Sequence, residues 1–185
     1  TRPVLASLFS NIEEVNSDGN YLFSIMRGFR LEKLLFRLLD ENEFLSDYGI
    51  RSLSKYHEEH PYVFQHNGHH QISYESGESQ SNMFGGNSNW RGPIWLPLNY
   101  MIVQSLRKYY SYYGDQYVYE FPTGSGVKLN LNEIANEISK RLIKLFEPNE
   151  NGKFVYHSED CLLYTSDAAD DMQCVDLGGR RIIKK

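Results

Sequence analysis

The twelve residues Asn89–Tyr100, NWRGPIWLPLNY, combine two tryptophans, one arginine, two prolines, two asparagines and a tyrosine. Helices that only fill a core are built mainly from strong helix formers such as leucine, alanine and glutamate. Prolines are tolerated in the first turn of a helix, where the backbone N–H groups have no intrahelical partner. The stretch therefore predicts a helix that begins near Leu96 and has indole and guanidinium groups immediately before it.

Apolar spacing predicts three helices in all. The first covers about Leu31–Leu39, and the second runs from Leu96 to Tyr113, where Gly114 stops it. The third covers Asn130–Phe146, with Asn130 as N-cap and Glu133 completing a capping box. The expected apolar faces are Leu31, Leu34, Leu35 and Leu38 in the first helix; Leu98, Met101, Ile102, Leu106, Tyr109, Tyr110 and Tyr113 in the second; and Ile134, Ile138, Leu142 and Leu145 in the third.

The segments between these helices are longer than simple connections. Residues 40–54 lack a clear period and are predicted to form a long ordered loop, and residues 119–126, YEFPTGSG, are predicted to form a second loop. Around Asn67-Gly68, two alternating runs predict a β-hairpin with a tight primed turn. The fold class is therefore expected to be all-α with a small β-hairpin insertion.

Composition excludes several functional classes. The 185 residues suit one domain or a piece of a larger one, and a formal charge of −5 argues against nucleic-acid binding. No apolar run approaches the ~20 residues of a membrane span. The two cysteines, Cys161 and Cys174, form neither a disulfide framework nor a zinc motif, which is compatible with a cytoplasmic location. Because the chain begins with Thr1 and not Met, its true N-terminus is expected to lie further upstream.

Several uncommon motifs occur together in a recognisable order. They are LDENEFLSDYGIRSLSKYH, GGNSNWRGPIWLPLNY, YYGD, FPTGSG and NLNEIANEISKRLIKLF. Over roughly Leu31–Tyr156 the chain resembles glycoside hydrolase family 63, the group of mannosyl-oligosaccharide glucosidases and mannosylglycerate hydrolases, in its bacterial glucosidase-like branch. Trehalases share a shorter version of the Trp-Arg-Gly-Pro-Ile-Trp signature, so a trehalase-like hydrolase stays an alternative.

The resemblance implies an (α/α)6 barrel, here a partial one, that hydrolyses α-linked glucose- or mannose-type glycosides with inversion and without a metal or organic cofactor. Inversion needs two carboxyl groups ~6.5–9.5 Å apart, one protonating the leaving oxygen and one activating water. In the family, the general acid lies upstream of the matched region and the general base downstream, so no catalytic residue is assigned. Glu41, Glu43 and Asp47 are expected to be solvated or paired with arginine, and the chain alone is expected to be inactive.

The resemblance also implies a substrate-facing wall. Trp90 and Trp95 match the sugar-binding tryptophans of the family, whose flat faces stack on sugar rings. The whole predicted wall comprises Trp90, Trp95, Arg91, Asn89, Tyr48 and Arg51. In the alternative interpretation both tryptophans are core anchors, Arg91 is a buried ion-pair partner and Arg51 fastens its own loop through hydrogen bonds. A non-catalytic carbohydrate-binding module is the rival function.

The C-terminal segment Cys161–Lys185, CLLYTSDAADDMQCVDLGGRRIIKK, differs in composition from the preceding residues. It closely resembles the peptide obtained when a sequencing adapter is translated. Residues 158–185 are therefore predicted to be an artefactual, disordered tail, and residues 1–157 a fragment of the barrel's catalytic domain. Five of the six histidines, His57, His60, His66, His69 and His70, are expected to be surface residues, not metal ligands.

Overall fold

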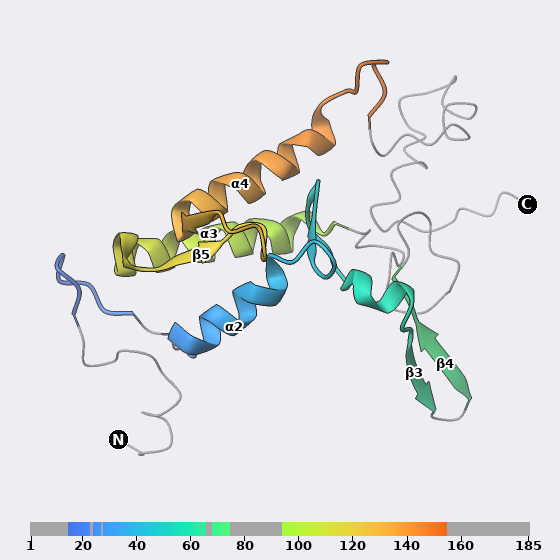
Figure 1. Ribbon diagram of the computed structural model, residues 1–185, viewed down its shortest axis with the longest axis horizontal. Helices are drawn as coiled ribbons and strands as arrows, with labels where there is room; N and C mark the ends of the chain where they lie inside the picture. Colours follow the sequence, from blue (N-terminus) through green and yellow to red (C-terminus); the bar gives the residue numbers. More distant parts are fainter. Residues whose placement is uncertain (1–14, 23, 27, 66–67, 75–93, 155–185) are drawn as a thin grey trace, which may run out of the picture. The chain divides into compact units, whose positions relative to one another are not determined.

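The computed structural model describes residues 15–22, 24–26, 28–65, 68–74 and 94–154 (Figure 1). Within these ranges it contains three α-helices, three two-stranded sheets and three short 3-10 helices. The order is α2 (Gly28–Leu38), β1 (Leu45–Ser46), β2 (Gly49–Ile50), η1 (Lys55–Glu58), β3 (Tyr62–Gln65), β4 (His69–Ile72), α3 (Leu96–Tyr113), η2 (Gly114–Gln116), β5 (Val118–Glu120), β6 (Lys128–Asn130), α4 (Leu131–Ile143) and η3 (Lys144–Phe146).

The chain divides into two compact units. One comprises the residues up to Leu45 together with Pro97–Ser139, and the other comprises Ser46–Leu96 and the residues from Lys140 onward. The buried apolar side chains of the first unit come from all three helices and the adjoining loops, which is the pattern expected of amphipathic helices around one core. They are Leu31, Leu35, Leu39, Leu45, Val103, Leu106, Tyr113, Phe121, Leu131, Ile134, Ala135 and Ile138.

The predicted all-α class is confirmed for its helices, whereas the strands are more numerous than the single predicted hairpin. The hairpin β3–β4 is confirmed, with Tyr62 paired to Ile72 and Gln65 to His69. This register places three residues in the connection instead of the two of a primed turn, and Gly68 has a φ of 142°. The predicted loop 119–126 instead begins within β5 and connects it to β6, in a second antiparallel hairpin.

The bounds of α3 match the prediction, and its buried face matches in part, because Leu106 and Tyr113 are buried as expected. Leu98 and Met101 are 37% and 63% exposed, whereas Asn99 is 1% exposed. The apolar and aromatic side chains of α3 are distributed around most of its circumference, so the sequence allows more than one apolar stripe. The neighbours that α3 packs against select the stripe Asn99, Val103, Leu106 and Tyr113. In α2, similarly, the predicted core residue Leu34 is 39% exposed.

The start of α4 confirms the predicted capping box. The Asn130 side-chain oxygen accepts hydrogen bonds from the backbone N–H groups of Asn132 (3.0 Å) and Glu133 (2.9 Å). In return, the Glu133 carboxylate accepts the Asn130 backbone N–H at 2.8 Å. Three N–H groups without intrahelical partners are thereby satisfied at the helix N-terminus.

Replacing Asn130 by alanine is expected to lower the free energy of unfolding by about 1 kcal/mol, because the two N–H groups lose their acceptor. Serine at the same position can accept the same bonds, so Asn130→Ser should retain most of this stability. The midpoint of urea unfolding measures both. Equal losses in the two variants would show that the cap is not the cause.

Candidate functional site

The predicted site residues fall into two groups. Asn89, Trp90 and Arg91 lie outside the described residues. Trp95 lies immediately before α3 and is half-buried. Tyr48 and Arg51 lie on either side of β2 and are also half-buried.

A tight turn presents Tyr48. The Ser46 hydroxyl donates to the Gly49 carbonyl oxygen at 2.8 Å and accepts the Tyr48 backbone N–H at 3.1 Å. Gly49 has a φ of 119°, a conformation that favours glycine because it has no Cβ. Ile50, the next residue, is buried. The turn is therefore fixed by its own hydrogen bonds and by the burial of Ile50.

Two arginines hold this loop. The Arg141 guanidinium donates to the Ser46 carbonyl oxygen at 2.8 Å. The Arg51 guanidinium carbon lies 5.7 Å from the centroid of the Tyr74 ring, within the range of a cation–π interaction. This ring contact is not the hydrogen bond of the loop-fastening alternative, so that alternative and a role at the cavity rim both stay predictions.

The loop acids behave as expected. Glu43 pairs with Arg37 at 3.4 Å, and Glu41 and Asp47 are exposed. Because the Arg37 side chain is largely exposed, solvent screens this ion pair and its contribution to stability is small.

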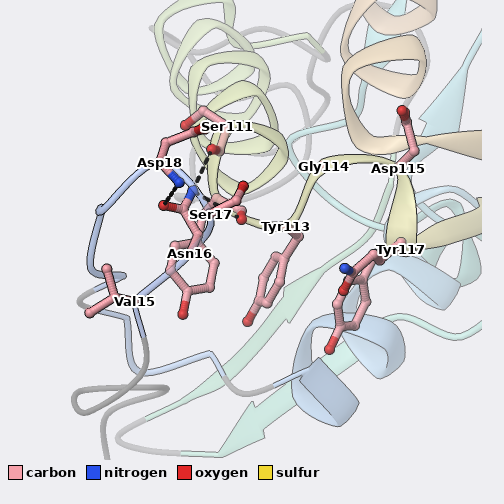
Figure 2. A pocket seen from close by; sticks show the side chains of 11 residues that line it. Val15, Asn16, Ser17, Asp18, Ser111, Tyr113, Gly114, Asp115 and Tyr117 are labelled. Atoms are coloured by element: carbon pink, nitrogen blue, oxygen red, sulfur yellow. Dashed lines mark hydrogen bonds between the residues drawn. The ribbon is translucent and has the colours of Figure 1, made fainter.

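Sequence reasoning missed a cavity of about 510 Å³ in the first unit (Figure 2). It lies between the segment Val15–Asp18 and the C-terminal end of α3, and Tyr48, Arg51 and Trp95 do not line it. Asn16 fastens the segment by donating to the carbonyl oxygens of Ser111 (3.3 Å) and Tyr112 (3.4 Å). Aromatic rings also line the cavity: the ring centroids of Tyr113 and Tyr117 are 4.3 Å apart. The remaining lining residues are Ser17, Asp18, Gly114, Asp115 and Gln116.

Two tyrosines of the first unit, Tyr110 and Tyr119, have perturbed acidity. The nearby carboxylate of Asp115 raises the pKa of Tyr110, because a negative neighbour disfavours the phenolate. Burial raises the pKa of Tyr119 to about 12, with smaller contributions from Tyr117 and Glu32. The hydroxyl of Tyr119 is buried and makes no hydrogen bond to the described residues.

Replacing Tyr119 by phenylalanine is expected to raise the free energy of unfolding by about 1 kcal/mol, because a buried hydroxyl without a partner is removed. The pKa of Tyr119 is raised in the folded state, so at alkaline pH the unfolded chain loses the phenol proton before the folded chain does. The folded state is therefore not penalised below pH 10, and its stability falls as the pH rises from 10 through about 12. Tyr119→Phe should remove this part of the alkaline loss. Urea unfolding at neutral and alkaline pH tests both points, and a variant less stable than the parent would contradict the expected gain.

Neither a metal-binding cluster nor a membrane-spanning helix is found among the described residues. These residues contain no group of three or more His, Cys, Asp or Glu side chains placed to hold a metal ion. None of the helices in the same ranges is long and apolar enough to cross a membrane.

Comparison with known families gives a match over the region that contains α2, α3 and α4. The model of the glycosyl hydrolase family 63 C-terminal domain matches residues 24–144. The chain belongs to glycosyl hydrolase family 63. The match contains Tyr48, Arg51 and Trp95, together with Asn89, Trp90 and Arg91.

Three relatives come from yeasts. An uncharacterized protein of Saccharomyces cerevisiae is 51% identical over 154 residues, which is 81% of this chain and 14% of the relative. A probable mannosyl-oligosaccharide glucosidase of Schizosaccharomyces pombe is 37% identical over 81 residues, 44% of this chain and 7% of the relative. A mannosyl-oligosaccharide glucosidase of Saccharomyces cerevisiae is 32% identical over 82 residues, again 44% of this chain and 7% of the relative. The chain thus spans a small share of each relative, and no solved structure gives a significant match.

Proposed function

We propose that this chain forms part of an inverting glycoside hydrolase that cleaves α-glucosidic or α-mannosidic bonds of oligosaccharides or small glycosides. The family 63 match over residues 24–144 is the observation that carries the proposal. The two yeast relatives named as mannosyl-oligosaccharide glucosidases support glucose-type substrates.

The proposed role of the chain is to bind the sugar and not to transfer protons. Trp90 and Trp95 offer flat aromatic faces to a sugar ring, and Arg91 and Asn89 offer donors to its hydroxyl groups. Tyr48 and Arg51 would stand at the rim of the same site. The general acid and general base are proposed to lie on other segments of the complete enzyme, ~6.5–9.5 Å apart.

Exposed apolar side chains support the proposal that the chain is part of a longer polypeptide with a complete (α/α)6 barrel. Large apolar residues are exposed on all three helices. They include Phe29, Phe36, Tyr100, Met101 and Ile143. In the complete barrel these faces would pack against further helices. The isolated chain is therefore expected to aggregate more readily and to melt less cooperatively than the full-length protein.

The test compares the full-length protein with the 185-residue chain. Both are incubated with aryl α-glucosides, kojibiose-type glucosides, mannosylglycerate and trehalose, and NMR follows the anomer of the first product. The full-length protein should release the inverted anomer and the chain should release none. Turnover by the chain alone would refute the missing-carboxylate proposal, whereas a retained anomer would refute inversion.

The same substrates separate the rival functions. Cleavage of trehalose alone would replace the proposal with a trehalase-like enzyme. Calorimetric sugar binding by an intact, cooperatively folded 185-residue chain, with no hydrolysis by the full-length protein, would replace it with a carbohydrate-binding module.

A further inference from the structure

Arg141 makes a contact that the sequence motifs do not suggest. It lies in the last turn of α4, is half-buried, and donates from its guanidinium to the carbonyl oxygen of Ser46 at 2.8 Å. The two residues are 95 positions apart in the chain. A charged donor makes a stronger hydrogen bond than a neutral one, so this contact restrains the backbone at Ser46.

Ser46 is also the residue that shapes the following turn. Its hydroxyl donates to the Gly49 carbonyl oxygen and accepts the Tyr48 backbone N–H. The carbonyl held by Arg141 and the hydroxyl that shapes the turn therefore belong to one residue. A shift of the Ser46 backbone would move the Tyr48 N–H away from its acceptor and change the direction of the Tyr48 side chain.

The far side of this loop is held separately. Arg51 lies over the Tyr74 ring, and the Tyr74 backbone N–H donates to the His57 carbonyl oxygen at 3.1 Å. Arg141 and Tyr74 restrain the two ends of the segment Ser46–Arg51, and Ile50 within this segment is buried. Such restraint keeps a binding side chain in one orientation before ligand arrives, which lowers the entropy lost on binding.

We propose that Arg141 is a positioning residue that orients the Ser46–Arg51 loop and thereby sets how Tyr48 meets the sugar. The proposal rests on the proposed function, because it takes Tyr48 as part of the sugar-binding wall. Arg141 itself acts through the Ser46 backbone and does not touch substrate. The guanidinium suits this task because its planar set of donors loses less freedom per hydrogen bond than a lysine ammonium.

The activity test is a double-mutant cycle in the full-length protein with Arg141→Ala, Tyr48→Ala and the pair. Arg141→Ala is expected to lower kcat/KM about tenfold, mainly by raising KM, because it loses one charge-assisted hydrogen bond. In the Tyr48→Ala background the same change should lower kcat/KM less than about twofold, because the two residues act as a unit. Lys144→Ala, at the exposed first residue of η3, is the matched control and should leave kcat/KM unchanged.

If the fold-losses of kcat/KM in the two single variants multiply in the double variant, the two residues act independently. That result would overturn the positioning role of Arg141 and leave it a general stabiliser. A measurement without substrate separates this result from failure of the proposed function. Hydrogen exchange of the Tyr48 amide should be about tenfold faster in Arg141→Ala than in the parent, while amides of the β3–β4 hairpin stay unchanged. An unchanged exchange rate of the Tyr48 amide in Arg141→Ala would overturn the inference even if the enzyme is active.

The remaining outcomes are also decisive. If the parent hydrolyses none of the glycosides, the proposed function fails, and the Tyr48 amide still reports whether Arg141 holds the loop. If Arg141→Ala does not fold, Arg141→Lys replaces it in both measurements. Lysine should recover only part of the parent's KM and of its Tyr48 protection, and complete recovery would show that a single positive charge is sufficient.

Discussion

Replacing Trp95 by alanine is expected to reduce kcat/KM of the full-length protein toward α-glucosides by roughly 100-fold, equivalent to about 2.7 kcal/mol of transition-state stabilisation. Trp95 stands immediately before α3 and is half-buried, so part of the indole is accessible. An indole face that stacks on a sugar ring contributes a large apolar contact at little cost in side-chain entropy. Removing it should also affect kcat, because a displaced sugar no longer aligns its glycosidic bond with the catalytic groups.

Trp95→Phe is the matched variant, because it keeps a flat aromatic face with a smaller area, and its loss of kcat/KM should be well below that of alanine. Steady-state kinetics and thermal unfolding of both variants distinguish the two interpretations of Trp95. If the indole were a core anchor, Trp95→Ala would lower the Tm strongly and leave the KM of the folded fraction unchanged. That result would remove Trp95 from the sugar-binding wall.

The features that could be predicted from the sequence are those that local chemistry decides. The start of α3 follows from the prolines and its end from Gly114, which has a φ of 62°. The cap of α4 follows from Asn130 and Glu133, whose reciprocal hydrogen bonds need only neighbouring residues. Such signals lie within a few positions of each other, so a single sequence contains them in full.

The features that were missed depend on distant contacts. Asn99 is buried and Met101 exposed because of the neighbours that α3 packs against, and their identities alone predict the opposite. The hairpin β5–β6 was missed because its strands are short and the connecting residues 121–127 exceed the two-residue primed turn. Thr123 in that connection donates to the carbonyl oxygens of Phe36 and Leu39, at the end of α2.

The candidate site shows the same division. The motif of residues 45–54 predicted Tyr48 and Arg51 as binding residues, but it did not indicate which residues hold their loop in place. Their loop is held by Arg141 and Tyr74, which no local pattern connects to it. Such long-range contacts are formed only in the folded chain. The sequence therefore predicts the candidate binding residues better than the residues that hold them in place.

Replacing Ile138 by alanine is expected to lower the free energy of unfolding by roughly 2–5 kcal/mol, the largest stability loss predicted for this chain. Ile138 lies on the apolar face of α4 and is 0% exposed, as are Leu131, Ile134 and Ala135 on the same face. Truncation removes three carbon atoms from contact with close-packed neighbours and leaves a cavity that the helix backbone cannot move to fill. Urea unfolding followed by far-ultraviolet circular dichroism measures the loss.

Ile143 provides the control in the 185-residue chain, because it is the same residue type on the same helix but is 54% exposed there. Ile143→Ala should change the free energy of unfolding by no more than about 0.5 kcal/mol, since alanine favours the helix and little buried area is lost. Both variants delete the same atoms, so the difference between them isolates burial from helix propensity. Similar losses at the two positions would mean that the buried face of α4 is not the one described, and the core built on Leu131, Ile134 and Ile138 would have to be reassigned.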